Sequence, residues 1–196
     1  VKDGAGGSTD CDNTDCADAA WIDDIIFPPA YMESEGTPGD VNMDGIINIL
    51  DVIVIINMIL GIEDENALAD LNGDGSINIQ DIILVINLIL GPRLDNASKV
   101  QLFKTDSAMK MESNGYVGAL KMVLQHGSNF NIELTEQALV KGFNTQNNTT
   151  TLVIVVPETD HLFSYEGSFE IVEVEAANSN SMIPVTLPSK TSLESA

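Results

Sequence analysis

The chain is 196 residues long and has 30 acidic but only 8 basic side chains, which gives a formal net charge of −22. A chain this acidic cannot neutralise phosphates, so the composition excludes binding to nucleic acid through its backbone charge. The apolar runs are about nine residues long, too short to span a bilayer as helices, and the length suits one domain or two small ones.

Residues 1–36 are predicted to form a loop-rich segment that ends in a strand and a linker. Cys11 and Cys16 are the only cysteines, and a small disulfide between them is expected, because a zinc site would need further Cys or His nearby. Residues 20–29 predict a short strand that ends at two prolines and resembles the last strand of jelly-roll accessory domains in secreted hydrolases. The first residue is Val rather than Met, so we expect a processed piece of a longer secreted precursor.

Two twelve-residue stretches, Asp40–Asp51 and Asp70–Asp81, share the pattern D-x-N-x-D-G-x-I-N-x-x-D. This is the EF-hand loop formula with Asp in place of Glu at position 12. Such a loop offers Ca²⁺ oxygen ligands from positions 1, 3, 5, 7, 9 and 12, whereas Mg²⁺ demands a tighter octahedron. The predicted ligands are Asp40, Asn42, Asp44, the Ile46 carbonyl, Asn48 and Asp51 in the first loop, and Asp70, Asn72, Asp74, the Ser76 carbonyl, Asn78 and Asp81 in the second. We therefore predict two Ca²⁺ ions; simple Asx-turns are disfavoured because every ligand position is matched twice.

Each loop leads into a strongly apolar segment, predicted as helices at 52–60 and 82–90 that end at Gly61 and Gly91. Residues 39–61 and 69–91 align with 14 of 23 positions identical. A doubled loop–helix unit with Asp at position 12 and no helix before the loop resembles the dockerin module, over about residues 37–94. The resemblance implies that two Ca²⁺ ions hold the fold and that the helices dock onto a cohesin β-sandwich.

The dockerin resemblance also implies a set of partner-contact positions. They are Ile49, Leu50, Ile56 and Asn57 in the first repeat, and Ile79, Gln80, Ile86 and Asn87 in the second. The Ser-Thr pair common in the family is replaced by Ile-Leu and Ile-Gln, which leaves the class of partner open. Independently, a helix that is apolar all round must be buried all round, and two such helices cannot fully cover each other. Their remaining apolar surface meets either another molecule or the rest of this chain, and the sequence leaves both alternatives open.

Residues 98–188 predict an antiparallel β-sandwich, so the fold class is α+β and multidomain, with a small all-α calcium module before the sandwich. Strands are predicted at 100–104, 116–125, 130–134, 151–156 and 169–175, with a polar turn at 144–150. The segments 118–124, 152–156 and 181–185 resemble a shortened cohesin, and a generic immunoglobulin-like spacer is the alternative. Residues 189–196 are expected to be a polar tail or linker.

No catalytic motif accompanies these elements, and we predict that the chain is not an enzyme. His126 and His161 are the only histidines, and neither lies in a metal-ligand spacing or a nucleophile motif. The predicted function is an extracellular, calcium-stabilised assembly module, since weak calcium loops fill most easily outside the cell. Its partner is expected to present a cohesin-like sandwich or to be another copy of the chain, and head-to-tail docking of copies would give open filaments. The alternative is an accessory region that anchors a secreted hydrolase.

Overall fold

The computed structural model describes residues 36–187. The predicted disulfide between Cys11 and Cys16, the strand at residues 20–29 and the tail at 189–196 lie outside the described residues. None of the helices between residues 36 and 187 is long and apolar enough to cross a membrane.

Two apolar helices follow the predicted calcium loops. Helix α2 spans Ile49–Ile59 and helix α3 spans Ile79–Leu90, with the 3-10 turn η2 (Ala67–Ala69) between them. Each helix begins three residues earlier than predicted, because an asparagine inside the loop caps its first turn. Helix α3 ends at Gly91, whose φ of 79° is left-handed, as the sequence predicts.

The described residues after Gly91 hold ten strands in two sheets. The strands are β1 (Val100–Lys104), β2 (Ala108–Ser113), β3 (Ala119–His126), β4 (Asn131–Leu134), β5 (Ala138–Gln146), β6 (Thr149–Pro157), β7 (His161–Glu166), β8 (Phe169–Ala177), β9 (Met182–Ile183) and β10 (Val185–Thr186). One sheet has the order β10-β1-β2-β7-β4, and the other has the order β5-β6-β3-β8-β9. All neighbours are antiparallel except β1 and β10, which are parallel. The predicted sandwich, and with it the α+β fold class, is confirmed.

The predicted polar turn at residues 144–150 is wrong in extent. Strands β5 and β6 run through most of it and leave a two-residue connection at Asn147 and Asn148. Both asparagines have left-handed φ angles, 48° and 66°, as a tight hairpin between twisted strands requires. Five strands, β2, β5, β7, β9 and β10, are additional to the five predicted ones.

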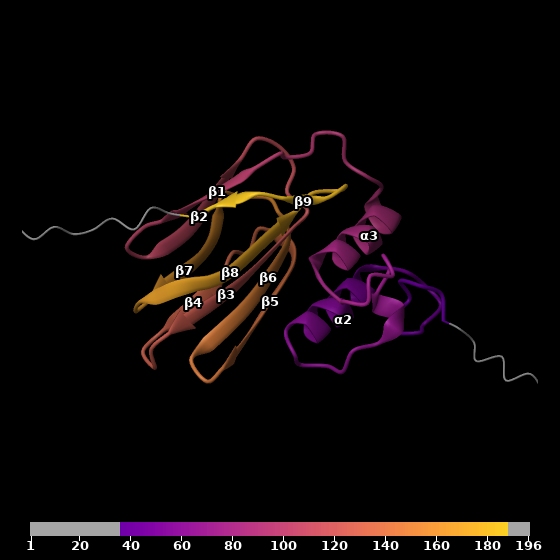
Figure 1. Ribbon diagram of the computed structural model, residues 1–196, viewed down its shortest axis with the longest axis horizontal. Coiled ribbons are helices and arrows are strands. Elements are labelled where there is room, and N and C mark those ends of the chain that lie inside the picture. The colour runs from indigo at the N-terminus through magenta and orange to yellow at the C-terminus, as the bar shows by residue number, and fades with distance from the viewer. Residues whose placement is uncertain (1–35, 188–196) are drawn as a thin grey trace, which may run out of the picture. The chain divides into compact units, whose positions relative to one another are not determined.

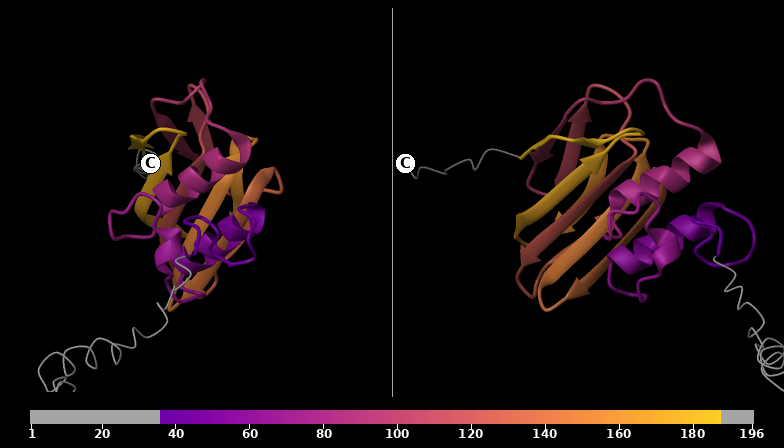
Figure 2. Two further views of the ribbon diagram at one scale, coloured as in Figure 1. Left: turned by 90° about the vertical axis from the view of Figure 1, so that its right-hand side faces the viewer. Right: turned by 45° about the vertical axis from the view of Figure 1, so that its right-hand side comes forward.

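Two hydrophobic cores divide this structure into three layers (Figure 1). The first core lies between the two sheets and includes Leu102, Leu120 and Phe163. The second lies between α2, α3 and the outer face of the β5-β6-β3-β8-β9 sheet. Figure 2 shows both helices lying across that face. The face is therefore covered by the helices of the same chain.

Candidate functional site

The two predicted calcium loops have nearly the same hydrogen bonds. In the first loop, the Asp40 carboxylate accepts from the backbone N–H groups of Asp44 at 3.1 Å and Gly45 at 3.0 Å. Asn42 Nδ2 donates to Asp44 Oδ2 at 3.0 Å. The equivalent bonds in the second loop, thirty residues further on, are 3.2, 2.9 and 2.8 Å long. The side chains at positions 1, 3 and 5 are thus gathered together in each loop.

The position-12 aspartates, Asp51 and Asp81, have no exposed surface. Asp51 Oδ1 accepts from the N–H groups of Val41 at 2.8 Å and Asn42 at 3.1 Å, while Oδ2 accepts from Asn48 N–H at 2.8 Å. Asp81 makes the equivalent three bonds at 2.9, 3.3 and 2.9 Å. These donors come from both ends of the loop, so each aspartate ties the loop closed in addition to its predicted role as a ligand.

The position-9 asparagines begin the helices. Asn48 Oδ1 accepts from Leu50 N–H at 2.8 Å, and its Nδ2 donates to the Ile46 carbonyl at 3.1 Å. Asn78 makes the equivalent bonds at 2.8 and 3.2 Å. With the aspartate at the third helical position, each asparagine completes a capping box. Asn48 and Asn78 are thus N-caps in addition to their predicted role as calcium ligands.

The loops fit a calcium ion by the chemistry of their donors. Each offers three carboxylates, amide oxygens and a main-chain carbonyl, which are the hard oxygen ligands that Ca²⁺ takes. Among the ion pairs of residues 36–187, none involves a loop aspartate. Within the same residues, no three Asp, Glu, His or Cys side chains converge closely enough to hold a metal by themselves. The set of calcium ligands stays a prediction.

Helices α2 and α3 pack against small side chains on the outer face of the β5-β6-β3-β8-β9 sheet. Ala119 in β3 is opposite Val155 in β6 and Ala177 in β8. All three are buried in the core that the sheet shares with the helices. Small side chains let the helix backbones approach the sheet closely, so that the isoleucines of α2 and α3 fill the space between them.

Two glycines allow close packing where α2 and α3 meet the outer sheet face, a contact that we call the helix–sheet joint. A side chain at Gly118 would collide with the Ile83 side chain of α3. A Cβ at Gly142 would lie 3.1 Å from Leu60 Cδ1 and 3.3 Å from Ile56 Cγ2. Neither glycine has a left-handed φ, so close packing of the helices is what requires the absence of a side chain at these positions.

Val156 adds to the joint through an unusual backbone conformation. Successive side chains in a strand normally point to opposite faces, yet Val155 and Val156 both belong to the core against the helices. Val156 has a φ of 49°, which is costly for a β-branched residue. Its N–H donates to the Gly118 carbonyl at 2.7 Å. This strained backbone conformation brings Val156 to the helix side in addition to Val153 and Val155.

Polar contacts border the joint. Asn144 Nδ2 donates to the Leu60 carbonyl at the end of α2 at 2.9 Å, and Asn87 Nδ2 of α3 donates to the Ser179 carbonyl at 2.8 Å. Each bond pairs a buried or half-buried group of the helix module with one of the sandwich, which fixes the position of each helix along the sheet.

Lys121 also lies on the outer sheet face, in the same strand as Ala119. Its Nζ is 2.7 Å from Glu173 Oε1 and 3.4 Å from Glu175 Oε2. Burial lowers the pKa of Lys121, but the hydrogen bond with Glu173 and the charges of Glu175 and Glu173 outweigh burial and raise this pKa above its ordinary value of 10.5. The lysine is thus a cation at neutral pH.

The predicted partner-contact positions fall into two groups. Ile56, Ile79 and Ile86 are buried in the core between the helices and the sheet. Leu50 is 51% exposed, and the remaining four are half-buried: Ile49, Asn57, Gln80 and Asn87. Of the two alternatives that the sequence left open, the structure shows burial within the same chain for these three isoleucines.

The strand pattern predicted above does not identify the sheet face that the helices cover, although one signal for it is present in the sequence. Residues 152–156, the run Leu-Val-Ile-Val-Val, are all buried. A strand that is apolar without alternation is covered on both faces, so this run indicates that something packs on the outside of the sandwich. Asn144, Ser179 and the two glycines carry no such signal.

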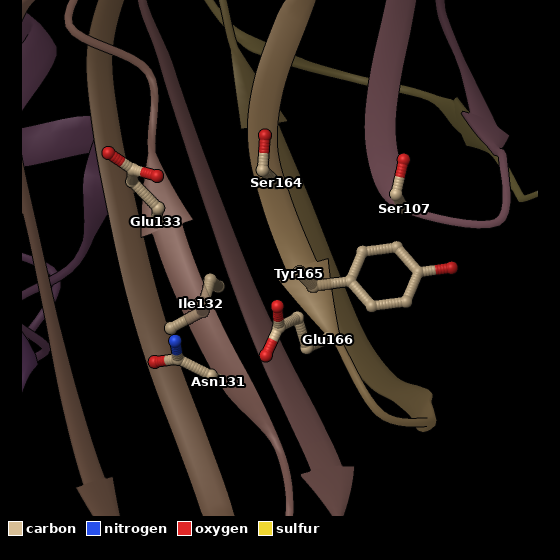
Figure 3. Close-up of a pocket in the computed structure, with 7 residues that line it drawn as sticks. All are labelled: Ser107, Asn131, Ile132, Glu133, Ser164, Tyr165 and Glu166. Atoms are coloured by element: carbon tan, nitrogen blue, oxygen red, sulfur yellow. The ribbon is translucent and has the colours of Figure 1, made fainter.

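A separate hollow of about 250 Å³ lies on the opposite sheet, against β4 and β7. Figure 3 shows its lining, and the residues are Ser107, Asn131, Ile132, Glu133, Ser164, Tyr165 and Glu166. Next to it, His161 Nε2 is 3.2 Å from Ser164 Oγ. Among the hydrogen bonds of residues 36–187, none joins His161 Nδ1 to a carboxylate, so the pair is not oriented as in a catalytic triad.

The doubled loop, its capping boxes and its two apolar helices agree with a known family. Residues 38–90 match the family model of the dockerin type I domain. Residues 38–90 are a dockerin-like module. The matched segment contains both loops and both helices of the dockerin module and leaves the β-sandwich outside it. The resemblance predicted from the repeat is confirmed.

Two further comparisons concern the whole chain. Among solved structures, it is similar to a non-cellulosomal cohesin from the hyperthermophilic archaeon Archaeoglobus fulgidus, at 12% sequence identity and a TM-score of 0.35. That similarity covers 47% of this chain and 83% of the cohesin chain. No curated protein matches the chain.

Proposed function

We propose that this chain is a non-catalytic assembly module in which the dockerin helices are the docking part and the outer face of the β5-β6-β3-β8-β9 sheet is their receptor. The dockerin match supports a protein–protein assembly role. The observation that carries the proposal is the fit of α2 and α3 to that face, where Gly118 and Gly142 leave room for Ile83 and Leu60. Such a fit is typical of a specific interface.

The same contact can form between copies of the chain. If the helices of one molecule occupy the sheet face of the next, the contact is heterologous, and repetition gives an open filament unless the rotation closes a ring. The buried isoleucines and the bonds from Asn87 and Asn144 are then made between molecules instead of within one. The molecule in the structure is the closed, single-chain form of this joint.

Two Ca²⁺ ions, one in each loop, are proposed to hold the helices in their docking geometry, through the ligands predicted above. Their formal charge would reduce the net charge of the chain from −22 to −18, since each ion adds two positive charges. Dockerin modules are typical of secreted proteins, and calcium is plentiful outside the cell, so we place the function there.

Calcium removal tests the assembly. With Ca²⁺, the mass measured by light scattering is expected to rise with protein concentration, and addition of EGTA is expected to return it to that of one chain. The reason is that the ion stabilises the folded loops that hold the helices, so that its removal weakens the docking geometry, although the loops keep their own hydrogen bonds. Excess Mg²⁺ is the control and should not restore the larger species. A single-chain mass at every concentration in Ca²⁺ would overturn self-assembly.

A further inference from the structure

The second calcium loop contains a pair of residues that is chemically labile. The sequence has Asn-Gly twice, at Asn72–Gly73 and at Asn114–Gly115. In such a pair the backbone nitrogen of the glycine can attack Cγ of the asparagine, because glycine has no side chain to obstruct the approach. The new N–Cγ bond closes a succinimide ring, the Cγ–Nδ2 bond breaks, and the amide proton of the glycine leaves with ammonia. Water then opens the ring at either carbonyl and gives aspartate or isoaspartate.

The backbone of the loop explains why a glycine follows the asparagine. Gly73 has a left-handed φ of 70°, a conformation that glycine adopts without steric cost. The equivalent residue of the first loop, Met43, has a similar φ of 57°, although a residue with a Cβ adopts it only at a cost. The loop geometry therefore admits both residues, and of the two loops only the second combines asparagine with glycine.

The Asn72–Gly73 pair is exposed, and its surroundings are open. No atom lies within 4 Å of the place that a Cβ of Gly73 would take, so a succinimide ring meets no obstacle there. Gly73 N–H donates to Asp70 Oδ1 at 2.8 Å, and Asn72 Oδ1 accepts from Asp74 N–H at 2.8 Å. These bonds hold the reacting nitrogen and the side-chain amide in place, so the reaction requires the loop to open.

The Asn114–Gly115 pair is held more firmly. Asn114 Oδ1 accepts from Ser98 N–H at 3.0 Å, and Asn114 Nδ2 donates to Ser98 Oγ at 2.9 Å. A Cβ at Gly115 would collide with the Asp95 carbonyl oxygen, which shows how closely a second backbone segment packs on this glycine. The two identical pairs therefore differ in the freedom that the reaction needs.

We propose that Asn72–Gly73 is a site of spontaneous deamidation that bound calcium suppresses. Asn72 is a predicted calcium ligand, and an ion in the loop favours the closed form, in which Asp70 holds the glycine nitrogen. Deamidation therefore takes place while the second loop is empty and open. The inference concerns this loop alone and does not depend on self-assembly.

Either product changes the second loop. Isoaspartate adds a methylene group to the backbone between positions 3 and 4 and so alters the spacing of the predicted ligands, whereas aspartate adds a fourth carboxylate to Asp70, Asp74 and Asp81. Asn72 also lines a hollow of about 190 Å³, and the turn between β8 and β9, at residues 178–181, lines it too. The modified residue thus lies beside the helix–sheet joint, and a chain deprived of calcium keeps a permanent change there.

Incubation of the full-length chain in EGTA, and in parallel in Ca²⁺, tests the site. Peptide mass spectrometry follows the replacement of NH₂ by OH at each asparagine over time. In EGTA, Asn72 is expected to react about tenfold faster than Asn114, as the two hydrogen bonds that hold the Asn114 side chain allow. Saturating Ca²⁺ is expected to slow the reaction of Asn72 by at least about tenfold, because binding to the closed loop reduces the open fraction.

Exchange of one residue between the loops provides matched controls. Met43→Gly creates Asn-Gly in the first loop and is expected to make Asn42 reactive in EGTA. Gly73→Met gives the second loop the residue that the first loop carries at a similar φ and is expected to stop the reaction at Asn72. Both variants keep every predicted calcium ligand.

Three results would each overturn the inference. The first is a reaction at Asn72 that is no faster than that at Asn114 in EGTA. The second is an equal rate at Asn72 in EGTA and in Ca²⁺, and the third is an unreactive Asn42 in the Met43→Gly chain. None of these results bears on assembly, which is measured separately by light scattering.

Discussion

Replacing Asp81 by alanine is expected to unfold the second loop–helix unit and to release α3 from the sheet, even without calcium. The Asp81 carboxylate is fully buried and accepts from the backbone N–H groups of Leu71, Asn72 and Asn78. Alanine removes all three hydrogen bonds, and a hydrogen bond to a charged group contributes about 1.5–3 kcal/mol. We expect the free energy of unfolding to fall by more than about 3 kcal/mol, measured by chemical denaturation in EGTA.

Asp74→Ala is the matched comparison in the same loop. Asp74 is exposed, and its carboxylate accepts from Ser76 N–H and Asn72 Nδ2, so its loss is expected to matter little in EGTA. In Ca²⁺, however, Asp74→Ala should remove most of the stabilisation that the ion gives, because a predicted ligand is missing. Equal stability of Asp81→Ala and the original chain in EGTA would contradict the role of Asp81 in closing the loop.

Replacing Gly118 by phenylalanine is expected to separate the helices from the sheet while the sandwich stays folded. The new ring would have to occupy the place of the Ile83 side chain, which is buried with 5% of its surface exposed. Overpacking of this kind costs about 1–3 kcal/mol or more. The sandwich has its own core between the sheets, so its strands do not depend on the joint.

Hydrogen exchange measures the separation strand by strand. In Gly118→Phe, the amides of α2 and α3 should lose protection, whereas those of β3 and β7 should keep it, and assembly in Ca²⁺ should be lost. Gly118→Ala should have a smaller effect, since only the tip of Ile83 must move. Gly127→Phe is the control, because no atom lies within 4 Å of a Cβ at that position. Full protection of the helices in Gly118→Phe would contradict the joint as described.

The calcium loops and helices were predictable because their interactions are local. The bonds of Asp40 to Asp44 and Gly45 and those of Asp51 to Val41 and Asn48 join residues at most ten positions apart. The helix starts were placed three residues late because the asparagine of position 9 was treated as a ligand alone. Its second role as an N-cap moves the first helical residue into the loop.

The strands were predicted less completely. Strand β1 agrees with its predicted bounds, since Val100 and Leu102 alternate with polar or exposed neighbours. Strand β5 was missed because it is an edge strand with weak alternation, in which Gly142 and Lys141 interrupt the apolar pattern. Gly142 is required by the close approach of Ile56 in α2 and of Leu60, which follows α2. These residues are more than eighty positions away, and no local pattern indicates the requirement.

The sequence by itself determined the doubled loop, the two strongly apolar helices and the need to bury these helices. The reason is that the spacing of ligands within twelve residues and the apolar character of a helix are properties of short segments. Only the tertiary structure decided what buries them. The sheet surface that the helices pack against is formed by Ala119, Val155 and Ala177 on three strands. Its fit to the helices depends on the volumes of side chains that no single segment contains.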